Sequence, residues 1–135
     1  MRWHWWHVLT IGAVILALYK STSAGAGFTV KRIAQAIAKA EGYGVPGAIP
    51  TLRNNPGNIR SAAGPIAIYD SAAAGWDALY TQVARMLAGS SLYPPTWNIE
   101  QVAARYTGEA AYMNWARIVA GELGVSTLTT FSELA

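Results

Sequence analysis

The chain has 135 residues, of which 53% are hydrophobic and 13% charged, a composition that suits one folded domain and is too apolar for a disordered chain. The net charge of +3 includes Arg2 and Lys20, which lie in an apolar N-terminal segment. The rest of the chain has eight basic and seven acidic residues, which nearly balance and form no clustered basic patch. Nucleic-acid binding is therefore not expected. There is no cysteine and the only histidines, His4 and His7, lie in the same segment, so we expect no metal or cofactor, and an enzyme would take its acid–base chemistry from carboxylates, Tyr or Lys.

The N-terminal segment predicts contact with a membrane through residues 3–19. It carries no formal charge, and tryptophans precede and Tyr19-Lys20 follow its apolar centre, Val8 to Leu18. As a helix it would be about 26 Å long, which is marginal for a span. An uncleaved anchor is favoured over a signal peptide cleaved after Ala24-Gly25-Ala26, and a buried core helix is least favoured. We therefore divide the chain into an anchor or signal segment with a flexible linker (1–27) and a folded domain (28–135).

The first helix of that domain is predicted over 30–41, with Thr29 as its N-cap and Gly42 after its end. Ile33, Ile37 and Glu41 are spaced four residues apart and share one face. A carboxyl group on an apolar face, at the negative end of the helix dipole, should have a raised pKa. The alternative is a solvated Glu at a helix end, which is the more common fate of this residue type.

The remaining elements predict an α+β domain, mostly helical with one small β-hairpin, preceded by the N-terminal hydrophobic helix. In chain order we expect a loop over 42–57, strands at 59–60 and 66–69, and helices over about 72–87, 98–105 and 110–123.

Polar and aromatic side chains follow Glu41 in an order that suits sugar binding. Asn54, Asn55 and Asn58 surround a Pro-Gly turn, in which Gly57 is expected to need a positive φ. Asn side chains offer a donor and an acceptor to sugar hydroxyl and N-acetyl groups. Taken singly, the Asn residues can be explained as turn chemistry and the aromatic residues as core.

The order of these motifs resembles the compact lysozyme-like domains of phage-associated and bacterial lytic transglycosylases. It runs from Glu41-Gly42, through Asn54-Asn55-Pro56-Gly57-Asn58, to a tyrosine near the C-terminus, over about residues 30 to 130. The Asn-Asn-Pro-Gly-Asn segment is the most specific part. The larger members carry Glu-Ser and Gly-Leu-Met-Gln segments, which are missing here, so the resemblance is to the compact variant only.

The resemblance implies that the chain cleaves the MurNAc–GlcNAc β-1,4 bond of peptidoglycan glycan strands with Glu41 as the single catalytic acid and base. With the N-terminal segment as an anchor, we expect the enzyme to face the periplasm or cell wall or to lie in a virion-associated membrane; it would be exported if the segment is cleaved. Either Tyr106 or Tyr112 would approach Glu41. The expected substrate-binding residues are Asn54, Asn55, Asn58, Tyr69, Tyr106 and Tyr112.

Two other functions remain open. One is a muramidase that uses water as the nucleophile and Asp70 or Asp77 as a second carboxylate, as most glycosidases do. The other is a non-catalytic protein that binds the cell wall or forms part of a virion membrane.

We predict that the full-length chain partitions with membranes or detergent, whereas residues 28–135 remain in solution alone, because the apolar run lies entirely before residue 28. Membrane flotation of both forms is the measurement. Full-length protein that keeps its N-terminus and needs no detergent would contradict the membrane anchor.

Overall fold

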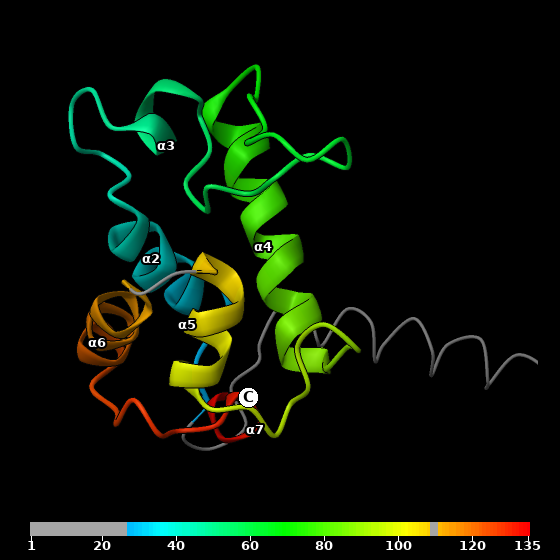
Figure 1. Ribbon diagram of the computed structural model, residues 1–135, viewed down its shortest axis with the longest axis vertical. Coiled ribbons are helices and arrows are strands. Elements are labelled where there is room, and N and C mark those ends of the chain that lie inside the picture. Colours follow the sequence, from blue (N-terminus) through cyan, green and yellow to red (C-terminus); the bar gives the residue numbers. More distant parts are fainter. Residues whose placement is uncertain (1–26, 109–110) are drawn as a thin grey trace, which may run out of the picture.

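The computed structural model describes residues 27–108 and 111–135, which fold into a mostly helical domain (Figure 1). The predicted hydrophobic helix of residues 3–19 lies outside the described residues. Within the described ranges, no helix has the length and hydropathy to cross a bilayer. The helices are α2 (Val30–Glu41), α3 (Ile49–Leu52), α4 (Ala72–Ala88), α5 (Ile99–Thr107), α6 (Tyr112–Leu123) and α7 (Phe131–Leu134).

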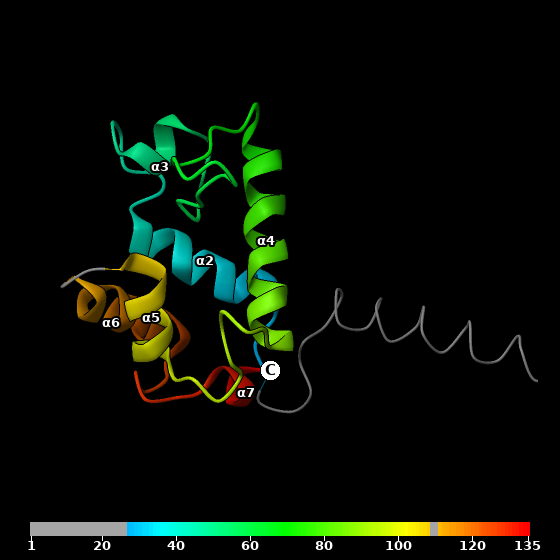
Figure 2. The ribbon, with the colours of Figure 1, turned by 45° about the vertical axis from the view of Figure 1, so that its right-hand side comes forward.

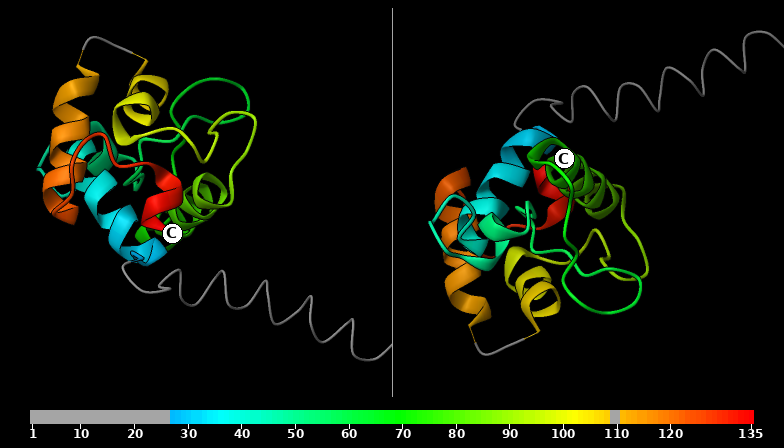
Figure 3. Two further views of the ribbon diagram at one scale, coloured as in Figure 1. Left: turned by 90° about the horizontal axis from the view of Figure 1, so that it is seen from below. Right: turned by 90° about the horizontal axis from the view of Figure 1, so that it is seen from above.

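Helix α2 lies in the middle of the domain, with α4 on one side and α6 on the other (Figures 2 and 3). Ile33 and Ile37 are fully buried, as their spacing predicts, and alanines fill most of the remaining buried positions of α2. Small side chains let the neighbouring helices approach on both sides. The central position of α2 fixes the direction in which its last residue, Glu41, points.

The ends of α2, α4 and α5 follow from local capping. Thr29, Ser71 and Asn98 each accept a hydrogen bond from a backbone N–H in the first turn of the following helix. Gly42 adopts the left-handed conformation that closes α2, with φ of 85°. The predicted helices at 30–41, 72–87, 98–105 and 110–123 are therefore confirmed, and their observed ends differ from the predicted ends by at most two residues.

The predicted β-hairpin is wrong in detail. Its two strands are replaced by a tight turn with one isolated antiparallel bridge between Arg60 and Ile66. Arg53 explains part of the difference, because its side chain donates to the Ile66 carbonyl and its own carbonyl accepts from the Tyr69 N–H. Ile68 is 72% exposed, so the segment has no apolar face to bury in a sheet. Among the described residues the only other bridge is also isolated, so the domain is mostly helical and its α+β classification is not supported.

Residues 49–59 and α4 meet at a glycine. Gly75 lies in the first turns of α4, and a Cβ atom there would be 1.8 Å from the carbonyl oxygen of Asn54. Any side chain at position 75 would therefore push α4 away from the loop. This close approach explains why Gly75 interrupts an otherwise good helical sequence.

The short helices α3 and α7 were not predicted from the sequence. The N-cap Thr130 and Glu133 form a capping box at the start of α7, and Phe131 and Leu134 are buried. The Phe28 N–H donates to the Leu134 carbonyl at 2.7 Å, so the two ends of the domain are joined directly. Helix α7 is stabilised mainly by this burial, because four residues are too few to form a helix alone.

We predict that Gly75→Ala lowers the free energy of unfolding by more than about 2 kcal/mol, because the backbone of Asn54 cannot move without opening the loop. Urea unfolding is the measurement. Gly121→Ala is the matched control: it also changes a glycine inside a helix, but nothing lies within 4 Å of its Cβ position, so we expect no loss or a gain of up to about 1 kcal/mol. Equal stability of the Gly75 variant would contradict the close approach.

Candidate functional site

Glu41 is the last residue of α2 and is held by a residue of α6. The indole Nε1–H of Trp115 donates to Glu41 Oε1 at 3.0 Å. Trp115 is 4% exposed, and a buried indole N–H needs an acceptor. The same contact that satisfies Trp115 therefore fixes one oxygen of the Glu41 carboxyl group.

Burial raises the pKa of Glu41 above its ordinary value. The hydrogen bonds from Trp115 and from the side chain of Asn58 lower the pKa, but less than burial raises it. The position at the C-terminal end of α2 also disfavours the anion. Glu41 thus has the environment of a carboxylic acid that keeps its proton to a higher pH than an exposed Glu.

Tyr106 joins α5 to the asparagine loop beside Glu41. Its hydroxyl donates to the Gly57 carbonyl at 2.5 Å, and the centroid of its ring lies 5.2 Å from the centroid of the Trp115 ring. Burial, and then the negative charge of Glu41, raise the pKa of Tyr106 well above the ordinary value of a phenol. Tyr106 therefore stays neutral, and its hydroxyl keeps the proton that it donates in the hydrogen bond to the Gly57 carbonyl.

A cleft of about 320 Å³ opens over these groups. Glu41, Asn58 and Tyr106 line this cleft, together with the cationic residues Arg60 and Arg105. Among the described residues that line the cleft, Glu41 is the only carboxylic acid. The described residues that line it are Glu41, Asn58, Arg60, Ile66, Arg105, Tyr106, Thr107 and Gly108.

Asn54 and Asn55 shape the loop, and neither is among the described residues that line the cleft. Asn55 is fully buried; its amide donates to the carbonyls of Ile59 and Ala67 and accepts from the Ile59 N–H. The Asn54 amide donates to the Tyr69 carbonyl at 3.1 Å. A loop without regular secondary structure needs such side chains to satisfy its buried backbone groups.

Asn58 lines the cleft. Its backbone φ of 50° lies in the left-handed region, and Asn54 at 48° is the second such residue. Gly57, for which the sequence predicted a positive φ, does not have one. Glycine is needed there for space, because a Cβ would lie 2.8 Å from Leu79 Cδ1 and 2.9 Å from the Tyr106 hydroxyl.

Of the predicted tyrosines, only Tyr106 lies at the cleft. Neither Tyr69 nor Tyr112 is among its lining residues. Trp115, Arg60 and Arg105 were not predicted as site residues. Trp115 looked like core from its helical spacing, and only the need of its N–H for a partner could have suggested a link to a buried carboxyl group.

The described residues contain no group of three or more His, Asp or Glu side chains placed to hold a metal ion. Comparisons with protein-family models, with curated proteins and with solved structures give no significant match to this chain.

We predict that Trp115→Phe raises the pKa of Glu41 further, because the carboxylate loses a hydrogen-bond donor while most of the apolar surroundings remain. A ¹³C NMR titration of the Glu41 carboxyl carbon is the measurement. Trp97→Phe is the control, because it changes a half-buried indole outside the cleft. This variant should leave the pKa of Glu41 unchanged. An unchanged or lowered pKa in the Trp115 variant would contradict the role of the indole N–H.

Proposed function

We propose that this chain is a lysozyme-like lytic transglycosylase that cleaves the MurNAc–GlcNAc β-1,4 bond of peptidoglycan, with Glu41 as its only catalytic carboxyl group. The observation that carries the proposal is the cleft in which Glu41, with a raised pKa, lies beside Asn58 and Tyr106. The order of motifs along the chain supports the same assignment, because one residue of each motif, Glu41, Asn58 and Tyr106, lines this cleft.

The environment of Glu41 suits a general acid that later acts as a base. Burial favours the neutral form, so the carboxyl group can arrive protonated and donate its proton to the glycosidic oxygen as the C1–O bond breaks. The two hydrogen bonds from Trp115 and Asn58 then stabilise the carboxylate that this transfer creates. The surroundings of Glu41 therefore suit both protonation states: burial favours the neutral acid, and the two hydrogen-bond donors stabilise the carboxylate.

One carboxyl group is sufficient if the substrate supplies the second. The carbonyl oxygen of the MurNAc N-acetyl group stabilises the positive charge at C1 after the GlcNAc oxygen has left. Ionised Glu41 then takes the proton of the MurNAc C6 hydroxyl, whose oxygen bonds to C1 and closes a 1,6-anhydro ring. Glu41 ends protonated, no water is consumed, and the enzyme is ready for another cycle.

The position of the two aspartates argues against a hydrolytic mechanism that uses them. Asp70 and Asp77 are exposed and neither lines the cleft. A second carboxylate must flank the scissile bond at about 5–10 Å from the acid. Ser71 caps α4 directly after Asp70, and the Asp77 carbonyl accepts from Thr81, so both positions belong to the local structure of this helix.

We predict that Glu41→Gln reduces cleavage of purified cell walls by at least about 100-fold, because the amide has no proton to donate to the leaving oxygen. Stability should not fall. The raised pKa of Glu41 means that the folded state loses stability as pH rises from the ordinary Glu range through the folded-state pKa, and Gln, which does not titrate, removes that loss. Turbidity clearing and thermal unfolding at several pH values are the measurements.

Asp70→Asn, Asp77→Asn and Glu109→Gln are the matched controls and should clear walls at close to the rate of the unmodified chain. Glu109 is included because it follows Gly108 of the cleft in the sequence while lying outside the described residues. Loss of activity in one of these variants would add a second carboxylate. Mass spectrometry of the products separates the reactions, because a hydrolytic product is heavier by one water. A Glu41 variant that clears walls normally would refute the catalytic role.

A further inference from the structure

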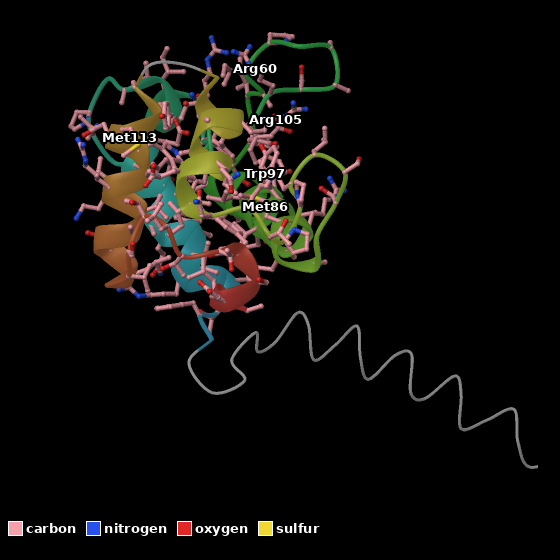
Figure 4. All side chains as sticks on the ribbon, turned by 60° about the horizontal axis from the view of Figure 1, so that its bottom comes forward. Arg60, Met86, Trp97, Arg105 and Met113 are labelled. Atoms are coloured by element: carbon pink, nitrogen blue, oxygen red, sulfur yellow. The ribbon has the colours of Figure 1, made fainter. Side chains whose placement is uncertain are left out.

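Two arginines line the same cleft as Glu41, and neither is explained by the reaction. Arg60 follows the asparagine loop, and Arg105 lies in the last turn of α5. Figure 4 shows both on the same side of the molecule, on separate segments. Both residues are exposed, so their guanidinium groups are open to an incoming molecule.

The positive charges of these arginines are not neutralised by the described part of the chain. No carboxylate in residues 27–108 or 111–135 forms an ion pair with either of them; the ion pair that is present joins Lys39 to Glu122. Arg60 gives one of its five N–H groups to the Gly64 carbonyl. Burial raises the pKa of Tyr93, and the positive charge of Arg105 opposes that rise.

Glu41 forms no ion pair with either arginine in the described part of the chain. Its carboxyl group instead accepts hydrogen bonds from Trp115 and Asn58. The described lining of the cleft therefore combines a half-buried acid, Glu41, with two cations, Arg60 and Arg105, that form no ion pair with a carboxylate of the described residues. These cations suit an anionic group of a ligand whose neutral part reaches Glu41.

We propose that Arg60 and Arg105 form a subsite for the carboxylates of the acidic peptide that is attached to the lactyl group of MurNAc. This inference rests on the proposed function. The peptide is bonded to the sugar whose C1 reacts, so it must lie close to the cleft when that sugar reaches Glu41. Guanidinium groups bind carboxylates through paired charge-assisted hydrogen bonds, for which two arginines on separate segments provide several donors.

The subsite would give the enzyme a preference among walls. Strands whose peptides carry free carboxylates would be cleaved faster than strands whose peptides are amidated. The neutral sugar alone cannot provide such a distinction. A phosphate group of another wall polymer would satisfy the same donors, but it is not bonded to the reacting sugar and its position would not be fixed.

The test uses the full chain and two forms of one substrate: glycan strands with free peptide carboxylates, and the same strands after carbodiimide coupling with ammonia converts these carboxylates to amides. We expect kcat/KM of the unmodified chain to be about tenfold higher for the free carboxylates, as exposed charge-assisted contacts allow. In the double variant Arg60→Gln/Arg105→Gln this ratio should fall toward one.

Arg85→Gln/Arg117→Gln is the matched control, because it removes the same charge from two exposed arginines outside the cleft and should keep the ratio. A ratio near one in the unmodified chain, or an equal fall in the control, would overturn the subsite. Inorganic phosphate that inhibits the unmodified chain but not the cleft variant, with a ratio near one, would assign the arginines to phosphate instead. Failure of the unmodified chain to cleave either substrate would refute the proposed function itself.

Discussion

The burial of helix α2 between α4 and α6 is the constraint on which the rest of the domain depends. Ile33 and Ile37 are fully buried, and the alanines around them let both neighbours pack closely. Since α2 packs against both of these helices, the position of its C-terminal residue is fixed by the core. Glu41 is thereby placed at the edge of the core, where it is too buried to be freely hydrated and still open to the cleft.

A small set of polar contacts then joins the parts of the chain that surround Glu41. Trp115 donates to the carboxyl group from α6, and its ring packs against Tyr106 of α5. The Tyr106 hydroxyl in turn donates to the Gly57 carbonyl and anchors the loop. Because these contacts form one chain of neighbours, the groups that shape the cleft also contribute to the stability of the domain.

The site also contains features that a purely structural region would avoid. The side-chain oxygen of Asn58 is buried without a hydrogen-bond partner, and Glu41 is a carboxyl group whose neutral form is favoured by its surroundings. Two cations nearby have no carboxylate partner in the described part of the chain. The first two features cost stability because both groups are buried, and in proteins such costs are concentrated where ligands bind or reactions occur.

The sequence by itself determined the four longer helices, α2, α4, α5 and α6, and the position of Glu41 on the buried face of α2. Both depend on contacts between residues three or four positions apart and on local caps. It could not distinguish Asn55, which supports the loop, from Asn58, which faces the cleft, nor decide between Tyr106 and Tyr112. It also misassigned the hairpin, where the side chain and backbone of Arg53 occupy the groups that a sheet would need. These outcomes depend on contacts between distant segments, such as Gly75 against Asn54 and Tyr106 against Gly57, and only the tertiary structure brings those segments together.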